Sequence, residues 1–154
     1  MTSINLTREE ADQRSRMIEV DHYDVTLDLK YSDTHFLSTT KVSFTSREIG
    51  STFIDLRAEE VHEVRLNGNP LPTNSYNPTY GIPLSGLQVA DYTLEVTAKI
   101  PYSRTGEGLH RFVDPADEKV YLYTQFETAD AKRVFACFDQ PDMKATYAPV
   151  SYTH

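Results

Sequence analysis

Apolar and polar residues alternate along much of the chain, with the period of two that is typical of half-buried β-strands. The clearest case runs from Tyr92 to Ile100, where every second residue is apolar. Near the N-terminal end, Tyr23, Val25 and Leu27 alternate with polar residues in the same way. The pattern predicts strands over residues 22–29, 36–45, 51–56, 61–66 and 92–100.

A helical pattern precedes the first of these strands. Thr7 is followed three residues later by Glu10, the spacing of a capping box, in which both side chains satisfy free amides at a helix start. Ala11, Ser15 and Ile18 then fall on one helical face. We therefore expect a short N-terminal helix.

Turn residues divide the predicted strands. Asn67-Gly68 predicts a tight hairpin turn, because both residues tolerate positive φ. Four prolines and two glycines make residues 69–87 mostly loops and short edges, and residues 129–136 suit a short helical turn. Without a repeat or linker, the chain is predicted to form one all-β domain over residues 1–154, a sandwich or curved sheet of mostly antiparallel strands.

Composition and charge narrow the classes of partner. Of the 154 residues, 39% are hydrophobic and 25% charged, as in an ordinary globular protein with a core. The net charge of -8 disfavours nucleic acid, because phosphate binding needs clustered basic residues. An acidic surface chiefly gives solubility, with a weaker tendency to attract cationic ligands.

The single cysteine and the hydropathy bear on location. Cys137 excludes a disulfide within the chain and fits a reducing compartment, and its apolar neighbours predict a buried, inert thiol. Charged residues interrupt the first 15 positions, so they do not form a signal peptide, and no apolar run is long enough to span a bilayer. We expect a cytoplasmic protein without a membrane partner.

Several catalytic motifs are absent or incomplete. His62-Glu63 opens like the zinc signature His-Glu-x-x-His, but Leu66 stands where the second histidine is needed and the segment is predicted to be a strand. No pair among the five histidines has metal-ligand spacing. A Ser-His-Asp triad assembles from distant positions and stays open, although no nucleophile elbow is present. The residues alone assign no catalytic and no metal-binding role.

Two segments have both a structural and a functional interpretation. Residues 106–112 are a connecting loop or, through two glycines, a loop in close contact with another backbone, with Arg111 free to pair with a carboxylate. Residues 120–127 alternate like a strand, with Gln125 and Glu127 on one face. Spacing alone favours an exposed polar face, whereas a functional role would be binding of a cationic or peptide-like group.

A resemblance decides between these interpretations. The segments Thr124-Gln-Phe-Glu127, Arg133-Val-Phe-Ala-Cys-Phe-Asp-Gln-Pro141 and Lys144-Ala-Thr-Tyr147 resemble the aminopeptidase N family of zinc metallopeptidases, and bacterial members in particular. Residues 23–29, 61–68 and 106–112 are similar to further elements of the family's N-terminal domain, so the resemblance covers nearly the whole chain.

The resemblance implies a saddle-like β domain that packs against a zinc-containing catalytic domain. By match to the family's Gln-x-Glu motif, Gln125 lines the pocket for the first side chain of the substrate, and Glu127 holds its α-ammonium group. A carboxylate there favours substrates with a free amino terminus, because an internal peptide bond offers no charge. The parent reaction would be removal of N-terminal residues from peptides.

The chain departs from the family in two ways. The family commonly has Pro at the position of Ala136 and Glu at that of Gln140, which predicts altered loop packing. The zinc motif and the Gly-x-Met-Glu-Asn loop are absent from these residues. We therefore expect a piece truncated before the catalytic domain, inactive alone and without its own cofactor, with zinc in the parent enzyme.

The expected partners follow from this interpretation. They are the missing catalytic domain and peptide N-termini, and the exposed packing surface can also support self-association. The alternative from another class is a stand-alone β-sandwich binding module without catalysis, which the all-β pattern and the incomplete catalytic motifs equally allow.

Overall fold

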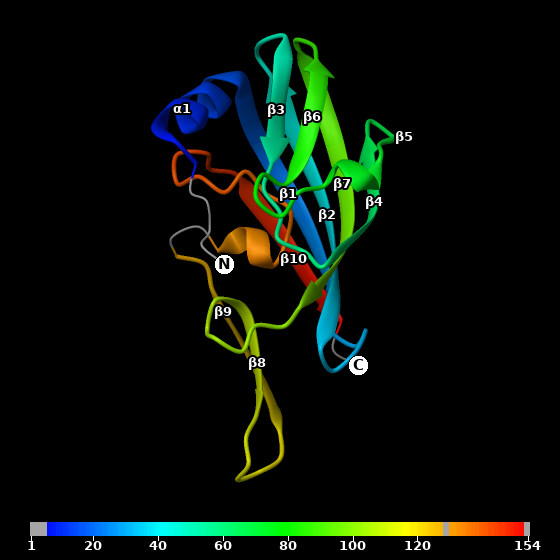
Figure 1. Ribbon diagram of the computed structural model, residues 1–154, viewed down its shortest axis with the longest axis vertical. Coiled ribbons are helices and arrows are strands. Elements are labelled where there is room, and N and C mark those ends of the chain that lie inside the picture. Colours follow the sequence, from blue (N-terminus) through cyan, green and yellow to red (C-terminus); the bar gives the residue numbers. More distant parts are fainter. Residues whose placement is uncertain (1–5, 128–129, 153–154) are drawn as a thin grey trace.

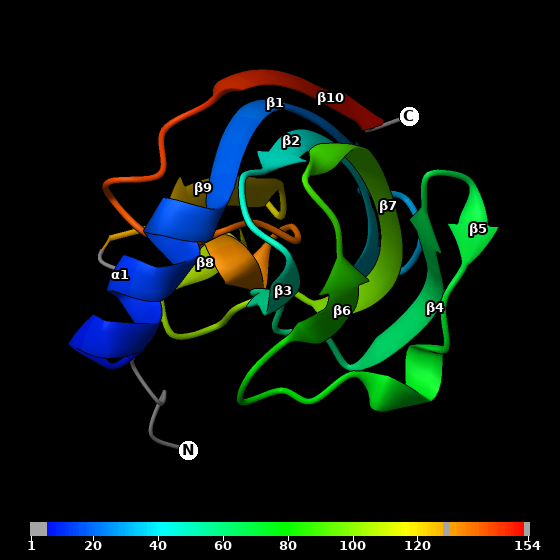
Figure 2. The ribbon, with the colours of Figure 1, turned by 90° about the horizontal axis from the view of Figure 1, so that it is seen from above.

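The computed structural model describes residues 6–127 and 130–152, and its main element is a six-stranded sheet. The strand order is β10 (Thr146–Tyr152), β1 (Ile18–Asp28), β2 (His35–Ser46), β7 (Ala90–Pro101), β4 (Glu60–Leu66) and β5 (Asn69–Pro70). Neighbours pair antiparallel except β1 and β10, which are parallel. The sheet is strongly curved (Figures 1 and 2).

The N-terminal helix α1 (Arg8–Met17) begins as its sequence predicts. The Thr7 side chain accepts a hydrogen bond from the Glu10 amide at 3.2 Å, and the Glu10 carboxylate accepts one from the Thr7 amide at 2.9 Å. The helix ends at Met17 because Ile18 has extended backbone angles and begins β1. The chain thus turns directly from helix into strand.

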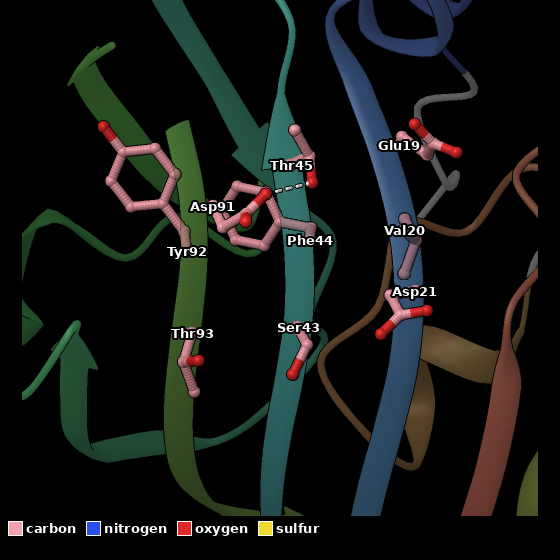
Figure 3. A pocket seen from close by; sticks show the side chains of 9 residues that line it. All are labelled: Glu19, Val20, Asp21, Ser43, Phe44, Thr45, Asp91, Tyr92 and Thr93. Atoms are coloured by element: carbon pink, nitrogen blue, oxygen red, sulfur yellow. Dashed lines mark hydrogen bonds between the residues drawn. The ribbon is translucent and has the colours of Figure 1, made fainter. Parts of the chain in front are cut away.

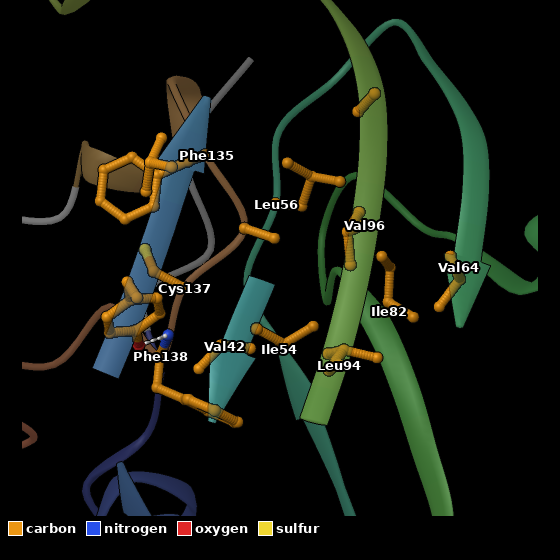
Figure 4. Packing of buried hydrophobic residues seen from close by; sticks show 14 of the residues in the cluster. Val42, Ile54, Leu56, Val64, Ile82, Leu94, Val96, Phe135, Cys137 and Phe138 are labelled. Carbon is orange, nitrogen blue, oxygen red and sulfur yellow. Dashed lines mark hydrogen bonds between the residues drawn. The ribbon is translucent and has the colours of Figure 1, made fainter. Parts of the chain in front are cut away.

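A second, smaller layer fills the concave side of the large sheet. Strands β3 (Gly50–Ile54) and β6 (Ile82–Leu87) pair antiparallel inside the curve, as Figure 2 shows. Apolar side chains from both layers meet there and are almost fully buried, among them Val42, Ile54, Val64, Ile82 and Leu94 (Figure 4). Each such burial contributes about 1.5–3 kcal/mol. The predicted all-β class with one short helix is confirmed.

Other strands refine the predicted boundaries. The turn at Asn67 and Gly68 is confirmed, since both have positive φ and connect β4 to β5. The region expected to hold loops and short edges contains η1 (Thr73–Ser75) and β6. Pro83 is tolerated in β6 because this strand pairs only with β3 and its other edge needs no hydrogen bonds.

A buried arginine connects the helix to the rest of the fold. Arg14 is only 1% exposed, and its Nη2 lies 2.7 Å from Asp55 Oδ2. Its other guanidinium nitrogens donate to the Phe53 carbonyl and to Gln140 Oε1, and the Phe53 and Phe138 rings lie 4.7 and 5.6 Å from its Cζ. We call these five residues the Arg14 cluster.

The Arg14 cluster fixes residues 131–143, which we call the 131–143 segment. Its backbone pairs with Asp55 through Cys137, with N–H to O distances of 2.9 and 3.0 Å in the two directions. The Asp139 amide also donates to Asp55 Oδ2 at 2.9 Å. The predicted short helical turn is η2 (Ala131–Arg133); position 129 lies outside the described residues.

The contacts of Cys137 and Gln140 in this segment bear on expectations from the sequence. Cys137 is buried as predicted, and burial raises the pKa of its thiol well above the ordinary value, so the thiol stays protonated. Gln140 accepts from Arg14 and donates through Nε2 to the Ala11 carbonyl at 3.1 Å. A glutamate could not make the second contact, so the amide has a structural reason in this chain.

We predict that Arg14→Met destabilises the fold by about 3–5 kcal/mol, because the buried Asp55 carboxylate loses its charged partner. Urea unfolding of the two proteins at pH 7 measures the difference. Arg47→Met is the matched control: Arg47 pairs with Glu19 at 3.2 Å with both side chains about half exposed, and its loss should cost at most about 1 kcal/mol. Equal costs for the two variants would contradict a central role for Arg14.

We also predict that Asp139→Asn stabilises the protein at pH 7. Partial burial raises the pKa of the Asp139 carboxyl above 3.8, so the folded state holds this proton more tightly than the unfolded state. The resulting stability is present at low pH and is lost as pH rises through the folded-state pKa. The amide oxygen of asparagine can still accept from the Lys132 amide.

Thermal unfolding between pH 3 and 7 tests the sign. The gain from Asp139→Asn should grow with pH and vanish where Asp139 is protonated in both states. Asp142→Asn is the opposite control, because a hydrogen bond from Ser15 lowers the pKa of Asp142, and its removal should cost stability at pH 7. A pH-independent effect of Asp139→Asn would overturn the assignment.

Candidate functional site

The candidate site lies where a protruding hairpin joins the body of the domain. Strands β8 (Gly108–Val113) and β9 (Val120–Gln125) pair antiparallel and extend away from the large sheet (Figure 1). Residues 106–112, which the sequence left as either a connecting loop or a close-contact loop, therefore belong to a strand from Gly108 onward. The strand predicted over residues 120–127 ends at Gln125, and Glu127 lies in the following turn. Both side chains are exposed, but strand alternation positions only Gln125.

Gln125 lies opposite Gly108, a glycine that allows β8 to lie close to Arg133. Gly108 is the register partner of Gln125 in β8 and has a φ of +68°. A Cβ at Gly108 would lie 2.8 Å from the Cβ of Arg133, which is too close for two carbon atoms. Of the two glycines expected to allow close contact with another backbone, only Gly108 makes a close approach, and it meets side-chain atoms of the η2 turn, whereas a Cβ at Gly106 would have only an ordinary contact at 3.6 Å with the Tyr123 hydroxyl.

Arg133 binds this end of the hairpin to the 131–143 segment. Its Nε donates to Asp130 Oδ1 at 2.8 Å, and its Nη1 lies 4.0 Å from Glu107 Oε2. Arg133 therefore links Asp130, which follows the candidate residues, to Glu107, which lies next to the register partner of Gln125.

The residue between the two candidates is fixed on the core. The Phe126 ring packs edge-on against Phe135, with centroids 6.2 Å apart, and the Phe126 carbonyl accepts a hydrogen bond from the Asp130 amide at 2.9 Å. Phe135 is buried and also contacts the rings of Tyr23 and Tyr147. The exposed amide and carboxylate of Gln125 and Glu127 therefore flank an aromatic side chain that is held in place.

The hairpin itself exposes an unusual amount of apolar surface. His110 stacks on Tyr123 with centroids 4.7 Å apart, and Phe112 stacks on Tyr121 at 5.5 Å. Every residue of β9 is exposed, including Leu122 on the opposite face. An isolated two-stranded hairpin is marginally stable in water, and a contiguous exposed apolar patch commonly marks a contact surface.

Figure 3 shows a second feature, a pocket of about 480 Å³ on the large sheet, lined by Glu19, Asp21 and Asp91 beside the stacked rings of Phe44 and Tyr92. Asp91 accepts a hydrogen bond from Thr45 at 2.6 Å, and Glu19 pairs with Arg47. No pattern in the sequence indicates this pocket, because its residues come from three separate strands. Its acidic lining is compatible with weak attraction of cations.

The described residues do not assemble a set of metal ligands. Among residues 6–127 and 130–152, no group of three or more His, Cys, Asp or Glu side chains could hold a metal ion. His62 lies on β4, as predicted for the incomplete zinc motif, with Glu60 at 3.7 Å; His154 lies outside the described residues. Within the same ranges no helix has the length and apolar character needed to cross a membrane.

Comparison with known proteins gives one consistent result. Residues 19–150 match the peptidase M1 N-terminal domain family. The chain is 51% identical over 150 residues to aminopeptidase N of Streptomyces lividans, covering 96% of this chain and 18% of that protein. It is 28% identical over 140 residues to the alanine/arginine aminopeptidase of Saccharomyces cerevisiae, covering 82% of this chain and 16% of the relative.

A solved structure supports the fold. The crystal structure of Legionella pneumophila aminopeptidase A in complex with aspartic acid matches with a TM-score of 0.70 at 21% identity, over 87% of this chain and 16% of that one. At this identity the match concerns the fold alone. The chain thus spans less than a fifth of the length of these relatives.

We predict that Gly108→Ala loosens the hairpin, because the new Cβ would meet Arg133 and the residue would keep a positive φ. The expected cost is about 2–4 kcal/mol in protection of the β8–β9 amides, measured by native-state hydrogen exchange. Gly68→Ala is the control. Gly68 has a φ of +81° but open space around it, so this substitution should cost only about 1 kcal/mol in protection of the amides around its own turn. Equal costs would show that backbone angle alone matters.

Proposed function

The chain belongs to the family of peptidase M1 N-terminal domains, and from this premise we propose that it is the substrate-anchoring domain of a zinc aminopeptidase that removes N-terminal residues from peptides. The relatives named above are aminopeptidases of which it matches less than a fifth. The catalytic activity in this proposal belongs to the longer protein, and this domain is inactive alone.

One observation carries the proposed role of the domain. Gln125 and Glu127 are exposed on either side of Phe126, whose ring is held against Phe135. In the proposal, Glu127 pairs with the α-ammonium group of a peptide, and Gln125 contacts the first side chain. A carboxylate held at this place favours free amino termini over internal peptide bonds, which carry no charge.

The proposal assigns the zinc ion to the longer protein and not to this chain. Zinc in such enzymes activates water for attack on a peptide carbonyl. In the proposal the metal ligands come from the longer protein; among the described residues no group of three or more His, Cys, Asp or Glu side chains could hold a metal ion. The contribution of the chain is to bind and orient the amino terminus.

The exposed hairpin supplies the contact surface for the catalytic domain in this proposal. The rings of Tyr121 and Tyr123 and the side chain of Leu122 are 37–48% exposed, and burying them would remove apolar area from water. The same hairpin leads directly to Gln125 and Glu127. Docking of the catalytic domain here would therefore bring these two residues to the edge of its active site.

A chimera tests the proposal. This chain would replace the matching N-terminal region of Streptomyces lividans aminopeptidase N, and hydrolysis of an aminoacyl p-nitroanilide would be measured. We predict that Glu127→Ala raises KM about 10- to 100-fold, because one charge-assisted contact to the ammonium group is lost. Gln125→Ala should instead change the relative rates for substrates with different first side chains.

The control is Glu63→Ala, which removes a half-exposed carboxylate on β4 and should leave KM unchanged. The chain alone, supplied with zinc, should show no turnover. An active chimera in which Glu127→Ala and Glu63→Ala behave alike would refute ammonium binding by Glu127. Turnover by the isolated chain that survives repurification and disappears with Glu127→Ala would refute its inactivity.

A further inference from the structure

A second pocket lies at the base of the β8–β9 hairpin and has the opposite character from the acidic one. Its volume is about 320 Å³. Residues from the loop after β1, from the segment after β7 and from β8 line it, among them Asp33, Thr34, Tyr102, Arg104, Arg111 and Phe112. We call it the basic pocket, because two arginines line it and Asp33 supplies its carboxylate.

The backbone brings the two arginines close together. Ser103 forms a parallel bridge with His110, in which the Ser103 amide donates to the Leu109 carbonyl at 2.8 Å and the Arg111 amide donates to the Ser103 carbonyl at 3.1 Å. Arg104 and Arg111 are the next residues along these two paired segments. Like charges placed side by side repel each other, and an anion between them would remove that cost.

Arg111 is held in place but only weakly paired. Its Cζ lies 5.8 Å from the centre of the Tyr102 ring, and that ring is fixed by a hydrogen bond from its hydroxyl to the Leu29 carbonyl at 3.0 Å. The nearest carboxylate oxygen, on Asp33, is 3.5 Å away, and the Asp33 side chain is 96% exposed. A contact this long to a solvated group is easily displaced.

Three other arginines of the chain have closer partners. Arg14, Arg47 and Arg133 each have a carboxylate oxygen within 3.2 Å. Arg104 is exposed at the pocket and has no hydrogen bond or ion pair within the described ranges. In a chain of net charge -8, two under-paired guanidinium groups on one cavity form a local positive site.

We propose that the basic pocket binds a small oxyanion, either a carboxylate or a phosphate, between Arg104 and Arg111. Guanidinium groups bind both anions through paired N–H donors. The fixed Tyr102 ring and Phe112 supply apolar walls for the body of a ligand, and the volume lies at the lower end of the range for small-molecule sites. The proposal is independent of the role of Gln125 and Glu127, because its test requires no catalysis.

Titration of the isotope-labelled 154-residue chain with sodium phosphate, and separately with sodium acetate, tests this site by NMR. We expect saturable shifts of the amides of Thr34, Arg104 and Arg111 with at least one anion, and the responding anion identifies the ligand class. Sodium chloride at matched ionic strength is the reference for non-specific effects. Arg104→Gln should weaken binding and so raise the dissociation constant at least ten-fold.

Arg104→Gln is the decisive variant because Arg104 makes no contact that the described fold needs, and its spectrum reports whether it is folded. Arg111→Gln should weaken binding to a similar degree. Arg65→Gln, which removes an exposed arginine of β4 paired with Glu63, is the matched control and should leave binding unchanged. Shifts that grow linearly with ionic strength, or saturable shifts unchanged by Arg104→Gln, would overturn the proposal.

Discussion

The burial of one guanidinium group is the constraint on which much of this structure depends. Arg14 leaves water at the cost of several kcal/mol unless its donors and its charge are matched. Asp55, the Phe53 carbonyl and Gln140 provide the match, and they come from two parts of the sequence that are distant from each other and from Arg14. The fold therefore cannot bury this helix face without also placing the end of β3 and the 131–143 segment.

The 131–143 segment transmits this order to the candidate site. On one side its backbone pairs with Asp55. On the other side Arg133 lies against Gly108 and pairs with Asp130, and Phe135 packs against Phe126. The same few residues therefore contribute to the stability of the core and to the position of Gln125 and the turn after it. Substitutions in this segment should affect folding and site geometry together.

The body of the domain and its hairpin expose surfaces of different chemistry. The large sheet carries a pocket with acidic side chains, whereas the hairpin exposes stacked rings and has two arginines at its base. A contact surface formed by β8 and β9 would suit a chain that spans less than a fifth of the length of its relatives, because an apolar hairpin of this kind gains stability when it is covered. Substrate anchoring and oxyanion binding would then use different groups on neighbouring segments.

The sequence by itself determined the local structure. Alternation of apolar residues, the Thr7 capping box and the Asn67-Gly68 turn depend on interactions between near neighbours, so they could be predicted without the fold. The motif around Gln125 and Glu127 was likewise visible, through its resemblance to a known family. Only the tertiary structure showed that β9 ends at Gln125, that β10 pairs parallel to β1 and that Arg14 is buried. These outcomes depend on contacts between residues far apart in the chain, and sequence spacing carries no information about such contacts.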